Sequence, residues 1–219
     1  MRIEKVLVVG AGDAAQIVTN ILLNTGNQDF FRSYKVIGYI DEHKTGEVDG
    51  IPILGGDDII ETVDFDKIII SISTLQNVKK KIFNKIVEKF GRDIFINVVH
   101  STAYIEPSAR IGVGNVIGAF VYIGHKTIIG DNNLISSHCS IEHHNRVGSH
   151  CTFAPNIQTS GRVQIDDLCL IGSRIMPSVH IGKNVQVSGN IPIWRDIPDN
   201  SRIVYETKLP WKMRKKNYD

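Results

Sequence analysis

The chain has 219 residues and a formal net charge of +2, with 42% apolar and 22% charged side chains. These values indicate one large or two small globular domains, and they exclude a strongly basic protein that binds nucleic acid or a membrane surface. Apolar runs fall short of the ~20 residues that cross a bilayer, so no spanning segment is expected. The three cysteines form no CxxC pair, and with no secretory leader visible they predict a cytoplasmic location.

The first hundred residues alternate aliphatic runs with segments of helical periodicity. In chain order, we expect a strand at 5–12, a helix at 13–26, a strand at 34–41, a short helix at 55–63, a strand at 67–73, a helix at 75–91 and a closing strand at 94–100. Such alternation predicts a small Rossmann-like parallel sheet with helices on its faces.

The turn between the first strand and the first helix reads VVGAGDAAQ. Gly10 and Gly12 resemble a dinucleotide-binding turn, but Ala15 stands where a third glycine would be expected, so the signal is weak. Asp41 ends the second strand, where a carboxylate can bind a ribose hydroxyl. A tight turn followed by an ordinary solvated aspartate explains the same residues equally simply.

A different pattern begins after residue 100. In blocks of six from Ile105 the chain reads IEPSAR, IGVGNV, IGAFVY, IGHKTI, IGDNNL, ISSHCS, IEHHNR, VGSHCT and FAPNIQ. Eight successive blocks begin with Ile or Val, which chance would produce on the order of once in 10⁵ for a given start. Glycine takes the second place in five of these eight blocks.

A period of six fits neither a helix nor a flat strand, and it predicts a coil of three short sides with one block per side. The first residue of each block should point inward, and the small fifth residue should lie near the corner. Glycine should permit the bend. About three blocks then make one coil, and coils stack ~4.8 Å apart. From residue 175 the phase changes, which we attribute to an insertion in PNIQTSGR, with a bulging loop near Gly161, and a deletion in LIGSRIMP.

The repeat resembles the hexapeptide left-handed β-helix acyltransferases. With the N-terminal half in front, the whole chain resembles the branch of sialic-acid O-acetyltransferases and bacillosamine N-acetyltransferases. SIEHHNRVGSH is similar to the IEH…GxxxH stretch of that branch, and WRDIPDNS is similar to its closing kDIPdnS. The resemblance implies three parts: a nucleotide-sugar-binding domain at 1–100, a left-handed parallel β-helix at 101–203 and a basic tail at 204–219.

The same resemblance implies an acetyl-CoA-dependent N-acetyltransferase that acts on a UDP- or dTDP-linked 4-amino-dideoxy sugar and supplies a bacterial surface glycan such as the O-antigen of lipopolysaccharide. His143 falls on the general base of the family, and a neutral imidazole can accept a proton at cellular pH. His144 follows it, where relatives usually carry an acidic residue that orients the base; the catalytic pair is therefore His143 and His144. His150 falls on a histidine near the acyl donor.

The resemblance also assigns ligand contacts. For acetyl-CoA these are His150, Gly161, Ser173 and Ser188. For the nucleotide-sugar they are Gly10, Gly12, Asp13, Asp41, Ser71 and Ser73. The family has GAGAvV where this chain has SGNIPIW, so the path of the pantetheine arm is expected to differ. A homotrimer is implied, with no metal, no nucleic acid and no membrane partner.

The histidines also permit a metal interpretation, which the coil disfavours. His138, His144 and His150 share the fourth place of three successive blocks, so they should diverge around the coil, whereas zinc needs converging ligands. Cys139 and Cys151 occupy small inward positions, which favours packing over nucleophilic catalysis. Three alternatives to N-acetylation remain: O-acetylation by the same fold, a zinc-dependent β-helix hydratase, and a non-catalytic module that binds a nucleotide-sugar or NAD.

Overall fold

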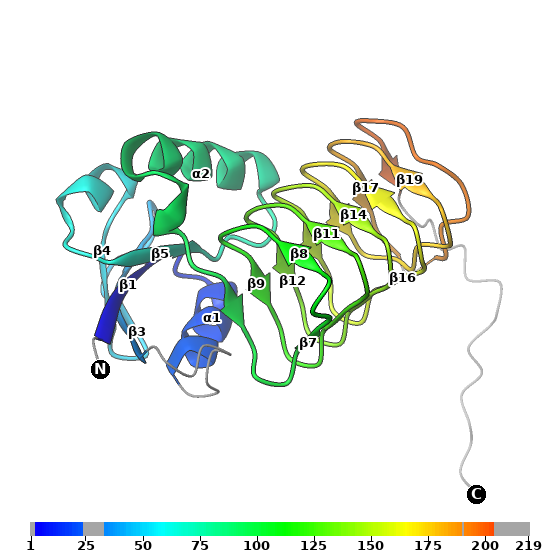
Figure 1. Ribbon diagram of the computed structural model, residues 1–219. Coiled ribbons are helices and arrows are strands. Elements are labelled where there is room, and N and C mark those ends of the chain that lie inside the picture. The colour runs from blue at the N-terminus through cyan, green and yellow to red at the C-terminus, as the bar shows by residue number, and fades with distance from the viewer. Residues whose placement is uncertain (1–2, 24–32, 190, 204–219) are drawn as a thin grey trace, which may run out of the picture.

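The computed structural model describes residues 3–23, 33–189 and 191–203. An α/β domain is followed by a parallel β-helix that extends away from it, so the molecule is elongated (Figure 1). The predicted basic tail, 204–219, lies outside the described residues. In the described part of the chain no helix is both long and apolar enough to cross a membrane.

The α/β domain contains a five-stranded sheet in the order β3-β4-β2-β1-β5. Its strands are β1 (Ile3–Val9), β2 (Ser33–Ile40), β3 (Glu47–Val48), β4 (Ile51–Gly55) and β5 (Lys67–Ile70). All pairs are parallel except β3 with β4, so the predicted parallel sheet is confirmed with one antiparallel edge strand.

Two helices cover opposite faces of this sheet, as the alternating pattern predicts. The face with Val6 and Val8 packs against α1 (Asp13–Leu23). The other face, with Leu7 and Val9, packs against α2 (Gln76–Phe90) and against the short 3₁₀ helix η1 (Asp57–Thr62). Because β1 is covered on both faces, its residues 6–9 are aliphatic without alternation.

The segment 94–100 is not the single closing strand that we expected. It follows the 3₁₀ helix η2 (Arg92–Ile94), and Phe95 makes a bridge to Ile68 of the first sheet. Strand β6 (Val98–Val99) pairs instead with the β-helix. The coil therefore begins before residue 101, and one short segment joins both sheets.

The β-helix has three sides of short parallel strands. The first side contains β7 (Tyr104–Ile105), β10 (Tyr122–Ile123), β13 (Ser140–Ile141) and β16 (Gln158–Thr159). The second contains β8 (Arg110–Ile111), β11 (Ile128–Ile129), β14 (Arg146–Val147), β17 (Gln164–Ile165) and β19 (His180–Ile181). The third contains β6, β9 (Val116–Ile117), β12 (Leu134–Ile135), β15 (Thr152–Phe153), β18 (Leu170–Ile171), β20 (Gln186–Val187) and β21 (Arg202–Ile203).

The predicted period of the coil is confirmed. Tyr122 pairs with Ser140, and Leu134 pairs with Thr152, each 18 positions further along the chain. First-place residues such as Ile123 and Ile141 fill the interior, and fifth-place residues from 115 to 151 are buried beside them. The aliphatic ladder of each side and the small corner residues thus form one continuous core.

Our explanation of the corner glycines was wrong. The positive φ that turns most corners belongs to the fourth residue, with values of 60° at His138 and His144 and 64° at His150. Gly118 and Gly124 are not in this region of φ. They are needed because coils approach closely: a Cβ at Gly118 would lie 2.8 Å from the backbone nitrogen of Ser137.

The predicted insertion near Gly161 was also wrong, whereas the deletion in LIGSRIMP is confirmed. Strands β16 and β17 keep the six-residue spacing, so Gly161 lies on a regular corner and not in a bulge. The next coil is shorter, because Thr159 pairs with Ile175 and Ile171 with Val187, two residues short of the full period. A four-residue side alone accounts for the change of phase.

Candidate active site

Each of the three fourth-place histidines lies on a different corner of the coil, as predicted. The corner between the first and second sides carries His144 and is called the His143 corner below. The corner between the second and third sides carries His150 and faces α2. The corner between the third and first sides carries His138, whose ring stacks on Phe120 with centroids 4.9 Å apart. His138, His144 and His150 therefore do not meet as three ligands of one metal within a single copy of the chain.

At the His143 corner two adjacent imidazoles are in contact. Nδ1 of His143 lies 3.1 Å from Nδ1 of His144, and the ring planes are 84° apart. His125, one coil earlier, lies edge-on to His144 with centroids 5.8 Å apart. Its own Nδ1 is 2.7 Å from Oγ of Ser108. The structure therefore brings together both predicted catalytic residues and adds His125 and Ser108.

The neighbouring coil holds the His143 ring in place. Gly161 lies directly against the imidazole, and a Cβ there would overlap Cε1 and Nε2 of the ring. The backbone N–H of Arg162 donates to the carbonyl oxygen of His143 at 3.0 Å. His143 itself is exposed. Its ring is thus supported on one side and open to a substrate on the other.

Positive groups surround His144. Burial lowers the pKa of His144, and Arg162, His143, Lys126 and His125 lower it further. His144 therefore stays neutral more readily than an isolated imidazole. The neighbouring carboxylate does not replace the missing acidic residue, because Glu142 accepts a hydrogen bond from Ser140 Oγ at 2.7 Å.

His150 is not part of this site. Its side chain is 5% exposed, its Nδ1 accepts a hydrogen bond from Asn132 Nδ2 at 3.0 Å, and its ring packs edge-on to Phe83 of α2. Burial, with a contribution from Lys79, lowers the pKa of His150 to about 4. The predicted contact of His150 with the acyl donor has no support in this geometry, and the residue joins the two domains instead.

The remaining residues assigned to the acyl donor do not converge either. Ser173 is fully buried, and its Oγ accepts a hydrogen bond from the backbone of Ile191 at 3.1 Å. Ser188 follows β20 on the third side, where its N–H donates to Ile203. Only Gly161 lies at the His143 corner, and it supports the base.

A cleft of about 280 Å³ lies between the two domains. Its lining includes Asp13 and Ser73 from the α/β domain, and Ser136, Ser137 and Pro155 from the β-helix. At Gly12, beside the cleft-lining Asp13, an added Cβ would meet no atom within 4 Å. Two of the predicted substrate contacts, Asp13 and Ser73, therefore share one cleft.

The other predicted substrate contacts shape the glycine turn. Asp41 accepts hydrogen bonds from the backbone of Ala11 at 2.9 Å and of His43 at 2.9 Å, and despite partial desolvation these bonds lower its pKa. Ser71 is buried, and its hydroxyl donates to the carbonyl oxygen of Val9. Gly10 has φ +98° and lies against Ser71 Oγ. These three residues fix the turn, and the ribose contacts of Asp41 and Ser71 stay predictions.

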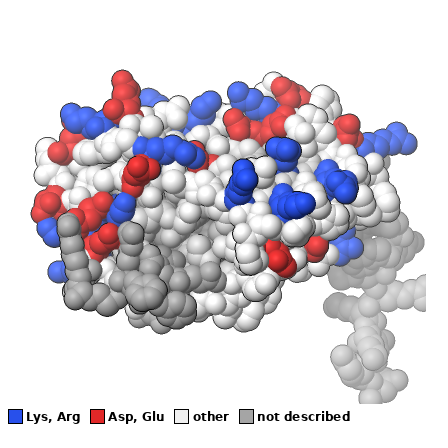
Figure 2. Space-filling view, in the orientation of Figure 1, with Lys and Arg blue, Asp and Glu red and all other residues white. Residues whose placement is uncertain are grey.

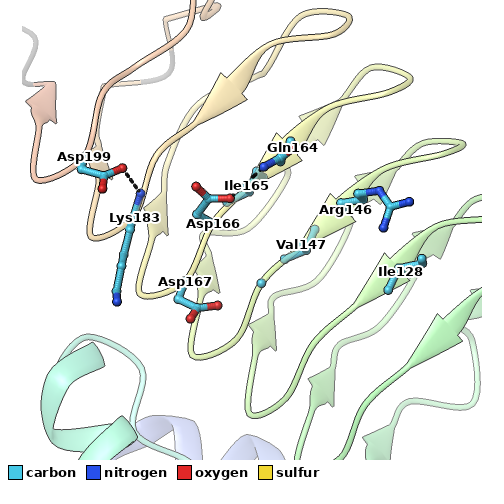
Figure 3. A pocket seen from close by; sticks show the side chains of 10 residues that line it. Ile128, Arg146, Val147, Gln164, Ile165, Asp166, Asp167, Lys183 and Asp199 are labelled. Carbon is cyan, nitrogen blue, oxygen red and sulfur yellow. Dashed lines mark hydrogen bonds between the residues drawn. The ribbon is translucent and has the colours of Figure 1, made fainter.

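Two neighbouring grooves on the second side were not predicted from the sequence. One, of about 510 Å³, includes Arg146, Asp166 and Lys183 (Figure 3). The other, of about 650 Å³, lies beside His144 and is lined by Arg110, Lys126 and Arg146. Figure 2 shows several Lys and Arg side chains on the β-helix. The sequence did contain a signal for these basic grooves, because Arg110 and Arg146 both precede inward residues on the same side of the coil.

The described residues offer little support for metal-dependent or thiol-dependent catalysis. Within 3–23, 33–189 and 191–203, no three His, Cys, Asp or Glu side chains are grouped as metal ligands. Cys139 and Cys151 are buried, as expected from their inward positions. Burial raises the pKa of the Cys139 thiol to about 11, so at neutral pH it is not a nucleophilic thiolate.

Comparison with known proteins supports the overall fold and finds a family match for the N-terminal part of the chain. Residues 5–86 match the family model of the PglD N-terminal domain. No curated protein sequence matches the chain. The acetyltransferase domain of PglB from Neisseria gonorrhoeae FA1090, solved with acetyl coenzyme A, is 20% identical, with 91% of this chain and 95% of that chain covered and a TM-score of 0.80.

Two further solved structures have the same fold. PerB from Caulobacter crescentus, in complex with CoA and GDP-perosamine, is 24% identical over 90% of this chain and 92% of that chain, with a TM-score of 0.76. WeeI from Acinetobacter baumannii AYE is 22% identical over 92% and 96%, with a TM-score of 0.78. The chain therefore joins a part that matches the PglD N-terminal domain to a three-sided β-helix, and it has the overall fold of these three solved structures, as the sequence resemblance predicted.

Proposed function

We propose that the chain transfers an acetyl group from acetyl-CoA to the amino group of a nucleotide-linked 4-amino sugar. The observation that carries this proposal is His143, an exposed imidazole supported by Gly161 and contacted at Nδ1 by His144. With Nδ1 engaged, Nε2 is the nitrogen available to a substrate. The fold is shared with proteins solved with acetyl coenzyme A or with CoA and GDP-perosamine, which supports the choice of donor and acceptor.

In the proposed reaction His143 Nε2 takes a proton from the acceptor amine as its lone pair forms the C–N bond. The thioester C–S bond breaks, and its electron pair leaves with the sulfur. His143 then returns the proton to the sulfur, so an amide and a thiol are formed and the histidine is regenerated. No covalent intermediate on the protein is needed, in agreement with the burial of Cys139 and Cys151.

The groove beside His144 suits the phosphate-bearing end of the donor. Arg110, Lys126 and Arg146 line it, and guanidinium and ammonium groups bind phosphate oxygens. We assign the donor phosphates to this groove, whereas Ser173, a predicted contact of acetyl-CoA, is buried.

The interdomain cleft suits the nucleotide-sugar, but it does not share lining residues with the His143 corner. A complete site therefore requires a second copy of the chain that brings its His143 corner to the cleft of the first. This requirement supports the proposed homotrimer, in which each site would be formed by two neighbouring chains.

The test is release of free thiol from acetyl-CoA in the presence of UDP-, dTDP- and GDP-linked 4-amino sugars. We expect turnover with at least one of them and far less with its 4-hydroxy counterpart, because an amine is the stronger nucleophile. Turnover should survive treatment with EDTA. Absence of thiol release across the whole panel would leave a binding module as the better interpretation, and preference for the hydroxyl sugar would indicate an O-acetyltransferase.

A further inference from the structure

We propose that His144 is a positioning residue whose unprotonated Nδ1 accepts the Nδ1–H of His143 and thereby fixes the tautomer in which Nε2 of His143 is the base. This deepens the proposed function and rests on it. His144 stands where the family resemblance implies an acidic residue, and it would support the base without carrying charge.

The distance between the two rings leaves room for one proton. Nδ1 of His143 and Nδ1 of His144 are 3.1 Å apart, so one nitrogen donates and the other accepts. If His144 donated, His143 would carry its proton at Nε2 and would lack a base on the exposed side. Only the arrangement in which His143 donates leaves that nitrogen free.

The same arrangement is the one that proton transfer requires. Once Nε2 of His143 has accepted the substrate proton, both nitrogens of its ring carry protons. The Nδ1–H must then have an acceptor, and His144 provides one without either ring turning. A pair already arranged in this way avoids reorganisation during the reaction.

The surroundings of His144 keep it an acceptor. Burial lowers the pKa of His144, and Arg162, His143, Lys126 and His125 lower it further by opposing a positive charge on its ring. Arg110 and Arg146, which line the adjoining groove, add further positive charge on the same side. A second proton on His144 is therefore disfavoured.

The position of the His144 ring is fixed by the coil. Its backbone is in the left-handed region at φ 60°, and its N–H donates to the carbonyl oxygen of His125 at 2.8 Å. The His125 ring lies edge-on to it, and Ser108 holds His125 through a contact of 2.7 Å. Ordered contacts on this corner thus extend over three coils, from Ser108 through His125 to the pair.

The kinetic test uses three variants at the same position. Asn tolerates a positive φ and offers a side-chain carbonyl as acceptor, so His144→Asn should keep kcat within about threefold, whereas His144→Ala should lower kcat about tenfold. KM for acetyl-CoA should stay within about twofold in both. In His144→Asp a carboxylate would stabilise the protonated base, so the acid limb of the kcat profile should move up by about one pH unit.

A second measurement does not depend on turnover. Ring-¹⁵N NMR of histidine-labelled protein, with His143→Asn used for assignment, should show His143 protonated at Nδ1 and unprotonated at Nε2 near neutral pH. In His144→Ala this tautomer should give way to a mixture, and His144→Asn should restore it. A loss of folding alone would not produce that restoration.

The outcomes separate the two proposals. If His143 carries its proton at Nε2 in the wild-type protein, or if His144→Ala keeps full kcat, His144 is not the positioning residue. If the expected tautomer is present and no amino sugar is acetylated, the proposed function fails and the assignment of the pair stands.

Discussion

Gly161 lies so close to His143 that no other residue fits at its position without moving the imidazole. A Cβ would overlap ring atoms Cε1 and Nε2. Gly161→Ala should therefore turn the ring away from His144 and lower kcat by about tenfold or more, because the base is displaced from its reactive orientation. Steady-state kinetics with saturating acetyl-CoA measure this effect.

The control for this variant is Ser160→Ala, one residue earlier on the same corner and already equipped with a Cβ. It should retain wild-type kcat and a wild-type melting temperature. Unchanged kcat in a folded Gly161→Ala protein would show that the ring tolerates displacement, and contact with Gly161 would then be packing alone.

Replacing the base itself should have the larger effect. His143→Ala should lower kcat by at least ~10²-fold with a modest change in KM, because general-base catalysis is lost while substrate contacts persist. His138→Ala, on another corner of the coil, serves as the matched control and should remain active. Near wild-type turnover in His143→Ala would assign the base to a different residue.

The buried amine at the domain interface predicts a pH-dependent stability. Lys79 is 1% exposed, its Nζ lies 3.4 Å from the carbonyl oxygen of Cys151, and burial lowers its pKa to about 7. The unfolded chain binds this proton below pH 10.5, but the folded chain binds it only below about 7. Stability should therefore fall as the pH decreases through this window.

Lys79→Met removes the titrating group and keeps an unbranched side chain. The variant should be more stable than the wild type at pH 7, and its urea midpoint should change less between pH 7 and pH 9. Burial of His150 acts in the same direction between pH 6.5 and about 4, where protonation favours the unfolded chain. Parallel midpoint curves for the two proteins would contradict the assignment of the upper window to Lys79.

The interdomain cleft can be tested by filling it. Ala14 lines the cleft at the start of α1, and Ala14→Leu should raise KM for the nucleotide-sugar about tenfold while KM for acetyl-CoA stays constant. Gln16→Leu, on the same helix and outside the cleft lining, is the control. Equal KM values in the two variants would place the acceptor elsewhere.

The sequence predicted the coil well because its signal repeats. Each block buries its first residue against the same core, so an error in one block is corrected by its neighbours. The corner conformation was misread because it leaves no fixed residue type: His138, His144, His150 and Arg162 all adopt it. The glycines were visible in the sequence, but they are required by the close approach of the adjacent coil. A local sequence pattern does not show that approach.

The candidate site was predictable only in part, for a related reason. His143 follows from a local motif, and the separation of the histidines follows from the period. His150 could not be placed, because its environment depends on how α2 docks on the β-helix through Phe83 and Asn132. The structural role of Asp41 and Ser71 could not be predicted, because the backbone groups of the turn that engage their side-chain oxygens are invisible in the sequence pattern.

The left-handed corners give the coil a route to greater heat resistance. A residue with a Cβ loses of order 1 kcal/mol in this conformation, and asparagine tolerates it better than most. Asn156 and Asn184 already occupy such corners, whereas Phe120 adopts the same φ without that tolerance. Asparagine at this outward position would leave the inward ladder untouched, so melting temperature can be raised at a corner that carries no chemistry.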